Sequence, residues 1–246
     1  NLIQKLPIFD ACTLRVSKLD EKILKHCKKL KAISRHGVGY DNVDLNYIKK
    51  NNISLLVTAT ANSVAVAEHV MSMFLSISKA IKTYDQEVKD GNFKTNANKI
   101  TTFEMLNKKI LIVGFGSVGR KLISRCLSFD THVYVYDPYV DEKIIKKHGG
   151  KKVNLINEGL KIADYVSLHV PLTKETKNLI NYSVLKKMKK NAVIVNTARG
   201  GIINEVDLDK ALNENIIFGA ALDVFSKEPI EKNNSLLKNK KVILSP

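Results

Sequence analysis

A glycine-rich turn between an apolar strand and a helix is the clearest chemical signal in the sequence. Gly114-Phe115-Gly116-Ser117-Val118-Gly119 follows the apolar run Ile110–Val113 and leads into a helical pattern over Val118–Leu127. The middle glycine lets the backbone approach a pyrophosphate, and the helix N-terminus offers unpaired N–H groups and partial positive charge. The pattern therefore predicts a dinucleotide site at Gly114, Gly116 and Gly119. The alternative is a purely structural glycine turn.

An acidic residue ends the next strand. Asp137 follows the strand Val133–Tyr136 and lies 18 residues after Gly119. At about this spacing, a carboxylate bonds the ribose diol of a dinucleotide. A carboxylate there would also repel a 2′-phosphate, so the pattern favours NAD over NADP. The alternative is a surface aspartate with no ligand.

Two charged side chains follow later strands, and a third lies on a turn further along the chain. Arg199 comes after the strand Val193–Val195, and Asp223 directly follows Gly219–Leu222. In a doubly wound sheet ligands bind beyond the carboxyl ends of the strands, so both side chains are expected in the ligand cleft. A guanidinium there would clamp a carboxylate or polarise a carbonyl. Glu228 lies on a rigid turn before a proline, and by itself it would be read as a loop carboxylate.

The elements that must position these residues alternate between strand and helix, which predicts a doubly wound parallel sheet with about six main strands. The predicted strands are Ile110–Val113, Val133–Tyr136, Val153–Leu155, Tyr165–Val170, Ala192–Asn196, Gly219–Leu222 and Val242–Leu244. The predicted helices between them are Val118–Leu127, Asp141–Lys147, Asn157–Ala163, Tyr182–Met188 and Glu205–Glu214.

The segment 8–60 repeats this alternation on a smaller scale. A helix capped by Asp20 is expected to turn Ile23, Leu24, Cys27 and Leu30 to one face. Strands are expected at 31–34 and 53–57, with a short helix at 44–50. Residues 63–89 are predicted as one long helix that crosses between domains or packs against another subunit.

The order and spacing of seven motifs resemble those of the D-isomer-specific 2-hydroxyacid dehydrogenases, nearest the phosphoglycerate dehydrogenase branch. The resemblance extends over essentially the whole chain. The motifs are Arg35–Asp44, Asn62–Glu68, Gly114–Gly119, Tyr136–Pro138, His169–Thr173, Asn196–Ile203 and Ala221–Pro229.

The resemblance implies a fold, a division into domains and a set of site residues. The fold would be α/β, with a Rossmann NAD-binding domain at 62–246 and a smaller, incomplete flavodoxin-like substrate-binding domain at 1–61. Arg199 and Glu228 would be catalytic, the arginine holding the substrate carboxylate and 2-oxo group and the glutamate orienting a histidine. The cofactor site would contain Val38, Gly114, Gly116, Ser117, Val118, Gly119, Asp137, Val170, Pro171, Thr197, Ala198, Arg199 and Asp223. The substrate site would contain Arg15, Gly37, Val38, Gly39 and Arg199.

The sequence departs from the family pattern at its end. The family's acid/base histidine directly follows a proline after the last strand of this domain, and here that proline is Pro246, the last residue. None of the six histidines occupies that place, and His36 and His169 are expected to have structural or solvated roles. We interpret the chain as a fragment cut at both ends, and expect it to bind NAD but to turn over very slowly.

The amino-acid composition excludes several classes of protein and of binding partner. The 246 residues are 44% apolar and include three scattered cysteines. These features argue against disorder, a disulfide scaffold, a zinc site or a transmembrane helix, and favour the cytoplasm. The net charge of +16 comes mostly from lysine, since only 5 of the 40 basic residues are arginine. Nucleic-acid readers rely on arginine, so we expect a solvated basic surface and neither a nucleic-acid nor a membrane partner.

The glycine loop and Asp137 predict NAD binding, and the family resemblance implies an oxidoreductase acting on a D-2-hydroxy acid. A homodimer formed through residues 63–89 is expected, and no metal. The basic Arg15 and the motif set favour 3-phosphoglycerate, whose oxidation is the first step of serine biosynthesis. Glycerate or hydroxypyruvate, glyoxylate and lactate remain open as substrates. The alternatives of another class are a non-catalytic NAD-binding scaffold resembling a corepressor, and a nucleic-acid-binding protein.

Overall fold

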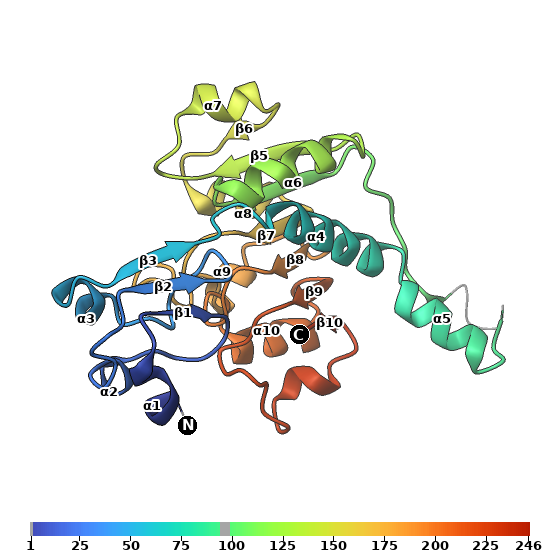
Figure 1. Ribbon diagram of the computed structural model, residues 1–246. Coiled ribbons are helices and arrows are strands. Elements are labelled where there is room, and N and C mark those ends of the chain that lie inside the picture. Colours follow the sequence, from blue (N-terminus) through green and yellow to red (C-terminus); the bar gives the residue numbers. More distant parts are fainter. Residues whose placement is uncertain (1, 94–98) are drawn as a thin grey trace. The chain divides into compact units, whose positions relative to one another are not determined.

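The computed structural model describes residues 2–93 and 99–246 and divides the chain into two compact units (Figure 1). Unit 1 comprises residues 1–62 and unit 2 comprises residues 63–246. Each unit is an α/β structure around its own parallel sheet. The predicted fold class, a doubly wound sheet with a smaller α/β unit, is confirmed.

Unit 1 contains a three-stranded parallel sheet in the order β1-β2-β3. The strands are β1 (Ala11–Leu14), β2 (Ala32–Arg35) and β3 (Ser54–Val57), and the helices are α1 (Leu2–Lys5), α2 (Glu21–Leu24) and α3 (Leu45–Lys50), with a 3₁₀ turn at Leu6–Ile8. The side chains of Asp20 and Asp44 accept hydrogen bonds from the backbone of the following helix and so fix where α2 and α3 begin.

Unit 2 is built on a seven-stranded sheet in the order β10-β9-β8-β7-β4-β5-β6, in which every neighbouring pair is parallel. The strands are β4 (Lys109–Val113), β5 (His132–Tyr136), β6 (Lys151–Lys152), β7 (Tyr165–Leu168), β8 (Val193–Asn196), β9 (Gly219–Leu222) and β10 (Val242–Leu244). The strand order reverses between β4 and β7, and ligands of open α/β sheets bind at such a switch point.

Helices cover both faces of this sheet. They are α4 (Ser63–Ser78), α5 (Ile81–Lys89), α6 (Ser117–Leu127), α7 (Glu142–Lys147), α8 (Ile156–Ile162), α9 (Tyr182–Leu185) and α10 (Glu205–Asn213), with a 3₁₀ turn at Ser235–Lys238. Consecutive residues of strand β4 belong to different hydrophobic clusters. Leu111 belongs to the cluster that contains the buried residues of α10, and Ile112 belongs to the cluster that contains Phe74 of α4 and Leu122 of α6. Because the central strands are buried on both faces of the sheet, their sequences are apolar at nearly every position.

Several predicted elements differ from the structure. The predicted strand Tyr165–Val170 ends at Leu168, and the predicted helix Tyr182–Met188 ends at Leu185. The single helix over 63–89 is wrong: α4 ends at Ser78, α5 begins at Ile81, and the two axes differ by 57°. Ala80 adopts a left-handed conformation (φ 50°) at this break. The third strand of the large sheet is β6 at Lys151–Lys152, not Val153–Leu155. The Asp20-capped helix ends at Leu24, although Cys27 and Leu30 are buried as expected.

Among the described residues, no helix by itself is both long and apolar enough to cross a bilayer, and only the bent pair α4 and α5 meets that criterion jointly. Cys12, Cys27 and Cys126 are free thiols. Within 2–93 and 99–246, no group of three or more His, Cys, Asp or Glu side chains is placed to hold a metal ion.

Candidate functional site

The carboxyl ends of six strands lie level across the sheet of unit 2. The pairing aligns the last residues of the strands in one row: Tyr136, Val113, Leu168, Asn196, Leu222 and Leu244. The residue after each strand therefore emerges at the same edge. These residues are Asp137, Gly114, His169, Thr197, Asp223 and Ser245. The register thus brings together the ends of the predicted motifs in unit 2.

The glycine loop after β4 leaves room where a pyrophosphate would sit. A Cβ built on Gly116 would meet nothing within 4 Å, whereas a Cβ on Gly119 would lie 2.4 Å from the carbonyl oxygen of Gly114. Gly116 precedes Ser117, the first residue of α6, and lacks a side chain to cap that helix. The loop is therefore tightly packed at Gly119, whereas the space beside Gly116 is empty and could receive a ligand.

Asp137 binds the same loop. Its Oδ2 accepts the N–H of Phe115 over 2.8 Å, and its Oδ1 accepts the N–H of Tyr139 over 2.9 Å. Each carboxylate oxygen can accept a further bond. The carboxylate therefore fixes the glycine loop and keeps acceptor capacity for a ribose hydroxyl.

The loop after β8 is shaped by a buried amide. Asn196 is 2% exposed; its Nδ2 donates to the carbonyl oxygen of Arg199, and its Oδ1 accepts the N–H of Ala198. The hydroxyl oxygen of Thr197 is buried without a hydrogen-bond partner among the described residues. A buried unsatisfied hydroxyl costs free energy, and a bound ligand would relieve that cost.

The Glu228 turn packs against this loop. A Cβ on Gly200 would lie 1.8 Å from the carbonyl oxygen of Phe225, so the two segments touch at Gly200. The Glu228 carboxylate accepts the N–H of Phe225 over 3.0 Å, and Glu205 accepts the N–H of Ser226 over 2.6 Å. The structure therefore places the predicted Glu228 on a turn next to the Arg199 loop, with its exposed carboxylate bonded within its own turn.

His169, Val170 and Pro171 follow β7 at the switch point. The carbonyl oxygen of His169 packs on Gly114, where a Cβ would approach to 2.6 Å. His169 Nε2 pairs with the buried hydroxyl of Ser167 over 2.8 Å. Desolvation by burial lowers the pKa of His169 to about 4. The imidazole is therefore neutral at pH 7, as expected for a structural histidine.

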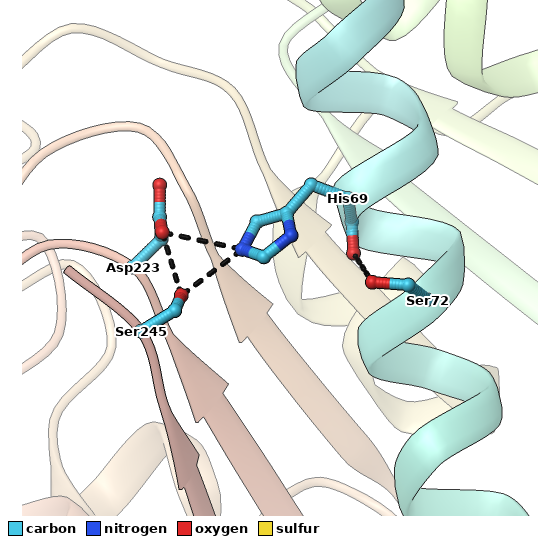
Figure 2. Close-up of polar contacts among 4 residues, drawn as sticks. All are labelled: His69, Ser72, Asp223 and Ser245. Atoms are coloured by element: carbon cyan, nitrogen blue, oxygen red, sulfur yellow. Dashed lines mark hydrogen bonds and ion pairs between the residues drawn. The ribbon is translucent and has the colours of Figure 1, made fainter.

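Sequence reasoning missed two residues at this edge. His69 of α4 and Ser245 after β10 lie within hydrogen-bonding distance of the predicted Asp223 (Figure 2). Val66, Val70 and Met73 mark the apolar stripe of this helix, and His69 falls within it. A polar side chain inside an apolar stripe was the signal that could have identified His69.

The predicted residues of unit 1 lie at the carboxyl edge of its own sheet. Leu14 pairs with Arg35, so Arg15 and the Gly37–Gly39 turn follow neighbouring strands at one level. The N–H of Gly37 donates to the Thr58 hydroxyl over 2.8 Å, so this amide is engaged within unit 1.

The residues at the edge of unit 2 fit a dinucleotide. Gly116 provides open space before an uncapped helix, Asp137 provides acceptors, and Thr197 provides an orphaned hydroxyl. Two family models match the chain. Residues 71–246 match the NAD binding domain, and residues 1–137 match the catalytic domain, of the D-isomer specific 2-hydroxyacid dehydrogenases. NAD is therefore the cofactor of this part of the chain.

The chain is similar to enzymes of different substrate specificity. It is 35% identical over its whole length to a D-3-phosphoglycerate dehydrogenase of Archaeoglobus fulgidus, but it spans only 46% of that protein. It is 36% identical to a glyoxylate reductase of Thermococcus litoralis and covers 75% of it. Its structure aligns over 99% of the chain with 77% of the D-lactate dehydrogenase of Aquifex aeolicus, solved with NAD and lactic acid (TM-score 0.89, 30% identity).

Proposed function

Because the chain belongs to the D-isomer-specific 2-hydroxyacid dehydrogenase family, we propose that it binds NAD at the carboxyl edge of unit 2 and serves the oxidation of a D-2-hydroxy acid or the reverse reduction. The observation that carries the proposal is the level row of strand ends that gathers the Gly114 loop, Asp137 and the Thr197–Arg199 loop. NAD, when bound, supplies the hydride acceptor at its nicotinamide ring.

In this proposal, residues of this chain bind the cofactor and the hydroxy acid and orient them for reaction. The first amides of α6 hold the pyrophosphate, and Asp137 holds the ribose diol. The Arg199 guanidinium clamps the carboxylate of the hydroxy acid, on a loop whose course Asn196 fixes through two hydrogen bonds. As the family resemblance implies, Glu228 would orient an acid/base histidine following Pro246, a place that none of the six histidines in this sequence occupies.

We propose 3-phosphoglycerate as the hydroxy acid. Arg15 is exposed at the carboxyl edge of the unit 1 sheet, where a guanidinium suits a phosphate group. Glyoxylate is the second candidate, because the glyoxylate reductase is as similar to this chain as the phosphoglycerate dehydrogenase. Hydroxypyruvate and lactate complete the set to be tested.

A substrate panel with two arginine-to-alanine variants tests this proposal. NADH absorbance is followed with 3-phosphoglycerate, glycerate, glyoxylate, hydroxypyruvate and lactate. Arg199→Ala is expected to abolish turnover of every substrate, whereas Arg15→Ala is expected to raise KM only for the phosphorylated one. Lys18→Ala removes a neighbouring surface cation that faces Asp20, and it serves as the control. Because very slow turnover is expected of residues 1–246 alone, the panel is run on a chain extended by a histidine after Pro246. NAD binding by that chain without turnover of any substrate would favour the scaffold alternative.

We also propose that two copies associate through α4 and α5. In α5 no side chain is buried, and Ile81 and Val88 are more than half exposed, at 53% and 52%. This helix continues beyond the end of α4 (Figure 1). A second copy would cover these side chains. The variant Ile81→Asp/Val88→Asp should sediment as a monomer where the wild type sediments as a dimer; a monomeric wild type would contradict the proposal.

A further inference from the structure

A cavity of about 830 Å³ lies in unit 2 at the amino ends of β8, β9 and β10, the end of the sheet opposite the proposed NAD site. It is lined by residues just before and at the start of these strands, by residues on both sides of the α4–α5 break, and by residues 99–101. At about 3.3 Å per residue, the four residues of β8 separate the two ends of the sheet by roughly 13 Å. A cavity of this volume accommodates a ligand as large as a nucleotide.

The charged residues that line this cavity are all of one sign. They are Lys82, Lys99, Lys190, Lys240 and Lys241, and the described residues of the lining include no aspartate, glutamate or histidine. The whole chain has 24 acidic residues against 40 basic ones, so a lining without a single carboxylate is a local excess of positive charge. Like charges gathered around one space repel one another and attract an anion, which relieves the repulsion.

One of these cations, Lys241, is held in place by uncharged groups. Its Nζ donates to the carbonyl oxygen of Leu212 over 2.7 Å and to Oδ1 of Asn215 over 2.6 Å. An ammonium group has three N–H donors, so one donor of Lys241 remains for a ligand. Neither acceptor is charged, so this partly buried ammonium has no carboxylate partner among the described residues. Lys241 is therefore a fixed positive charge that a phosphate oxygen can neutralise.

Another part of the lining is apolar. Ile77 of α4, Phe218 before β9 and Ile243 of β10 line the cavity and are only partly buried. The Phe218 ring meets the Phe103 ring edge to face with centroids 5.0 Å apart, a contact that holds its orientation. Inorganic phosphate would leave these side chains in water, whereas a ligand with a flat apolar body would cover them. The lining therefore fits a molecule that carries both phosphate groups and a ring.

We propose that this cavity binds a nucleoside polyphosphate, with the phosphates at the lysines and the base against the apolar side chains. Lysine binds phosphate as a compact point charge with three rotatable donors, and a base can stack on an aromatic ring whatever its sequence identity. The inference does not depend on the proposed NAD function, because the NAD site lies at the opposite end of the sheet. It gives the protein a second nucleotide site.

Calorimetric titration with ATP, tripolyphosphate and adenosine tests the inference. Every titration contains saturating NAD, so that ATP does not enter the dinucleotide site. The wild type should bind ATP with a Kd of about 0.1 mM or tighter, and tripolyphosphate, which lacks the base, about tenfold more weakly. Adenosine, which lacks the phosphates, should bind more weakly than either. Lys190→Gln/Lys240→Gln removes two exposed lysines of the lining and should weaken binding of ATP and tripolyphosphate about tenfold.

Two further variants complete the design. Phe218→Leu keeps an apolar side chain but removes the ring, so it should weaken ATP binding several-fold and leave tripolyphosphate binding unchanged. Lys146→Gln/Lys147→Gln is the matched control. It removes two exposed lysines from α7, which packs beside β6 at the other edge of the sheet from β10, so both affinities should stay within error of wild type.

Three outcomes would overturn the inference. Equal losses in the two lysine-pair variants would mean general attraction to the net positive charge, and equal affinities for ATP and tripolyphosphate would mean a site for phosphate alone. No ATP binding by the wild type, in the association state it has in solution, would mean that the cavity is closed or filled by a second copy. None of these results bears on the NAD proposal, which fails if the wild type binds no NAD. Even then, ATP binding that is weakened in Lys190→Gln/Lys240→Gln and not in the control would support the second site.

Discussion

Gly116 and Gly119 belong to one motif, but an added methyl group would meet different surroundings at each. At Gly119 it would lie 2.4 Å from a backbone oxygen, which cannot move without distorting the loop, whereas at Gly116 it would meet nothing within 4 Å beyond the adjoining residues. We therefore expect Gly119→Ala to lower the free energy of unfolding by about 1–3 kcal/mol, as overpacking does. Gly116→Ala should fold normally but lose most of its NAD affinity.

Thermal unfolding and calorimetric titration of the two variants check this pair of expectations. Each serves as the other's control, because the same methyl group is added three residues apart. A Gly116→Ala variant with wild-type NAD affinity would place the pyrophosphate elsewhere. The sequence motif predicted both glycines, but only the folded structure distinguishes the close packing at Gly119 from the open space at Gly116.

Because the imidazole of His169 is neutral in the folded protein, this residue makes folding stability depend on pH. Its pKa is about 4 in the folded protein, against 6.5 without burial. Between these values the unfolded chain binds a proton that the folded protein does not, so stability rises with pH across this window. The contribution is fully present above pH 6.5 and lost as the pH falls through 4. It amounts to about 3 kcal/mol.

Urea denaturation between pH 4 and pH 6.5 measures this contribution. His169→Gln removes the titration, and its amide can still bond the Ser167 hydroxyl, so the variant should show a flatter pH profile over the same window. His132→Gln is the control, because His132 is an exposed residue at the start of β5. Parallel profiles for wild type and His169→Gln would contradict the assignment.

At the scale of elements, the sequence predicted strands where a polar residue follows an apolar run. Gly219–Leu222 and Val242–Leu244 were predicted with the bounds observed, since Asp223 and Ser245 end them. The α4–α5 break was missed because the apolar spacing continues from Ile77 to Ile81 with no glycine or proline between them. Strand β6 was missed because its two residues are lysines at the sheet edge, where pairing needs no apolar side chain.

The break between α4 and α5 leads to a stability prediction. Ala80 holds a left-handed backbone (φ 50°, ψ 37°), which for a non-glycine residue costs about 1–2 kcal/mol. Glycine adopts this conformation freely but loses more entropy on folding. Ala80→Gly should therefore raise the free energy of unfolding by about 0.5–1 kcal/mol, measured by urea denaturation. The control Ala65→Gly, inside α4, should lower it by a similar amount. Destabilisation by Ala80→Gly would contradict the strained break.

At the scale of the molecule, each motif in unit 2 was predicted as a separate strand end, and the parallel pairing turned them into one row. Sequence spacing could not supply the register that sets Asp137, Thr197 and Asp223 level. Nor could it supply His69, which reaches Asp223 from 154 positions earlier in the chain through tertiary packing alone. The local chemistry was therefore predictable, and its long-range partners were not.

The net charge of +16 is shared by both units. Unit 1 carries 11 basic and 5 acidic residues, and unit 2 carries 29 and 19. Of the five arginines, Arg120 lies over the Phe115 ring and Arg125 pairs with Glu68, so both have partners within the protein. The remaining cations are mostly lysines, which act on phosphates as hydrated point charges without the bidentate fork that reads bases.

This distribution predicts weak, salt-sensitive contact with nucleic acid and a separate, stronger affinity for the cofactor. Duplex DNA should bind measurably only at low ionic strength and fall to a Kd of about 10⁻⁴ M or weaker at physiological salt, because such binding depends on counterion release. In the proposed site Gly116 and Asp137 would hold NAD through close contacts and hydrogen bonds, so NAD affinity should change far less over the same salt range. Fluorescence anisotropy with labelled DNA and calorimetry with NAD, titrated in parallel, measure both. DNA affinity that persisted at physiological salt would mean that the lysines form a selected nucleic-acid surface, and the scattered-charge interpretation would fall.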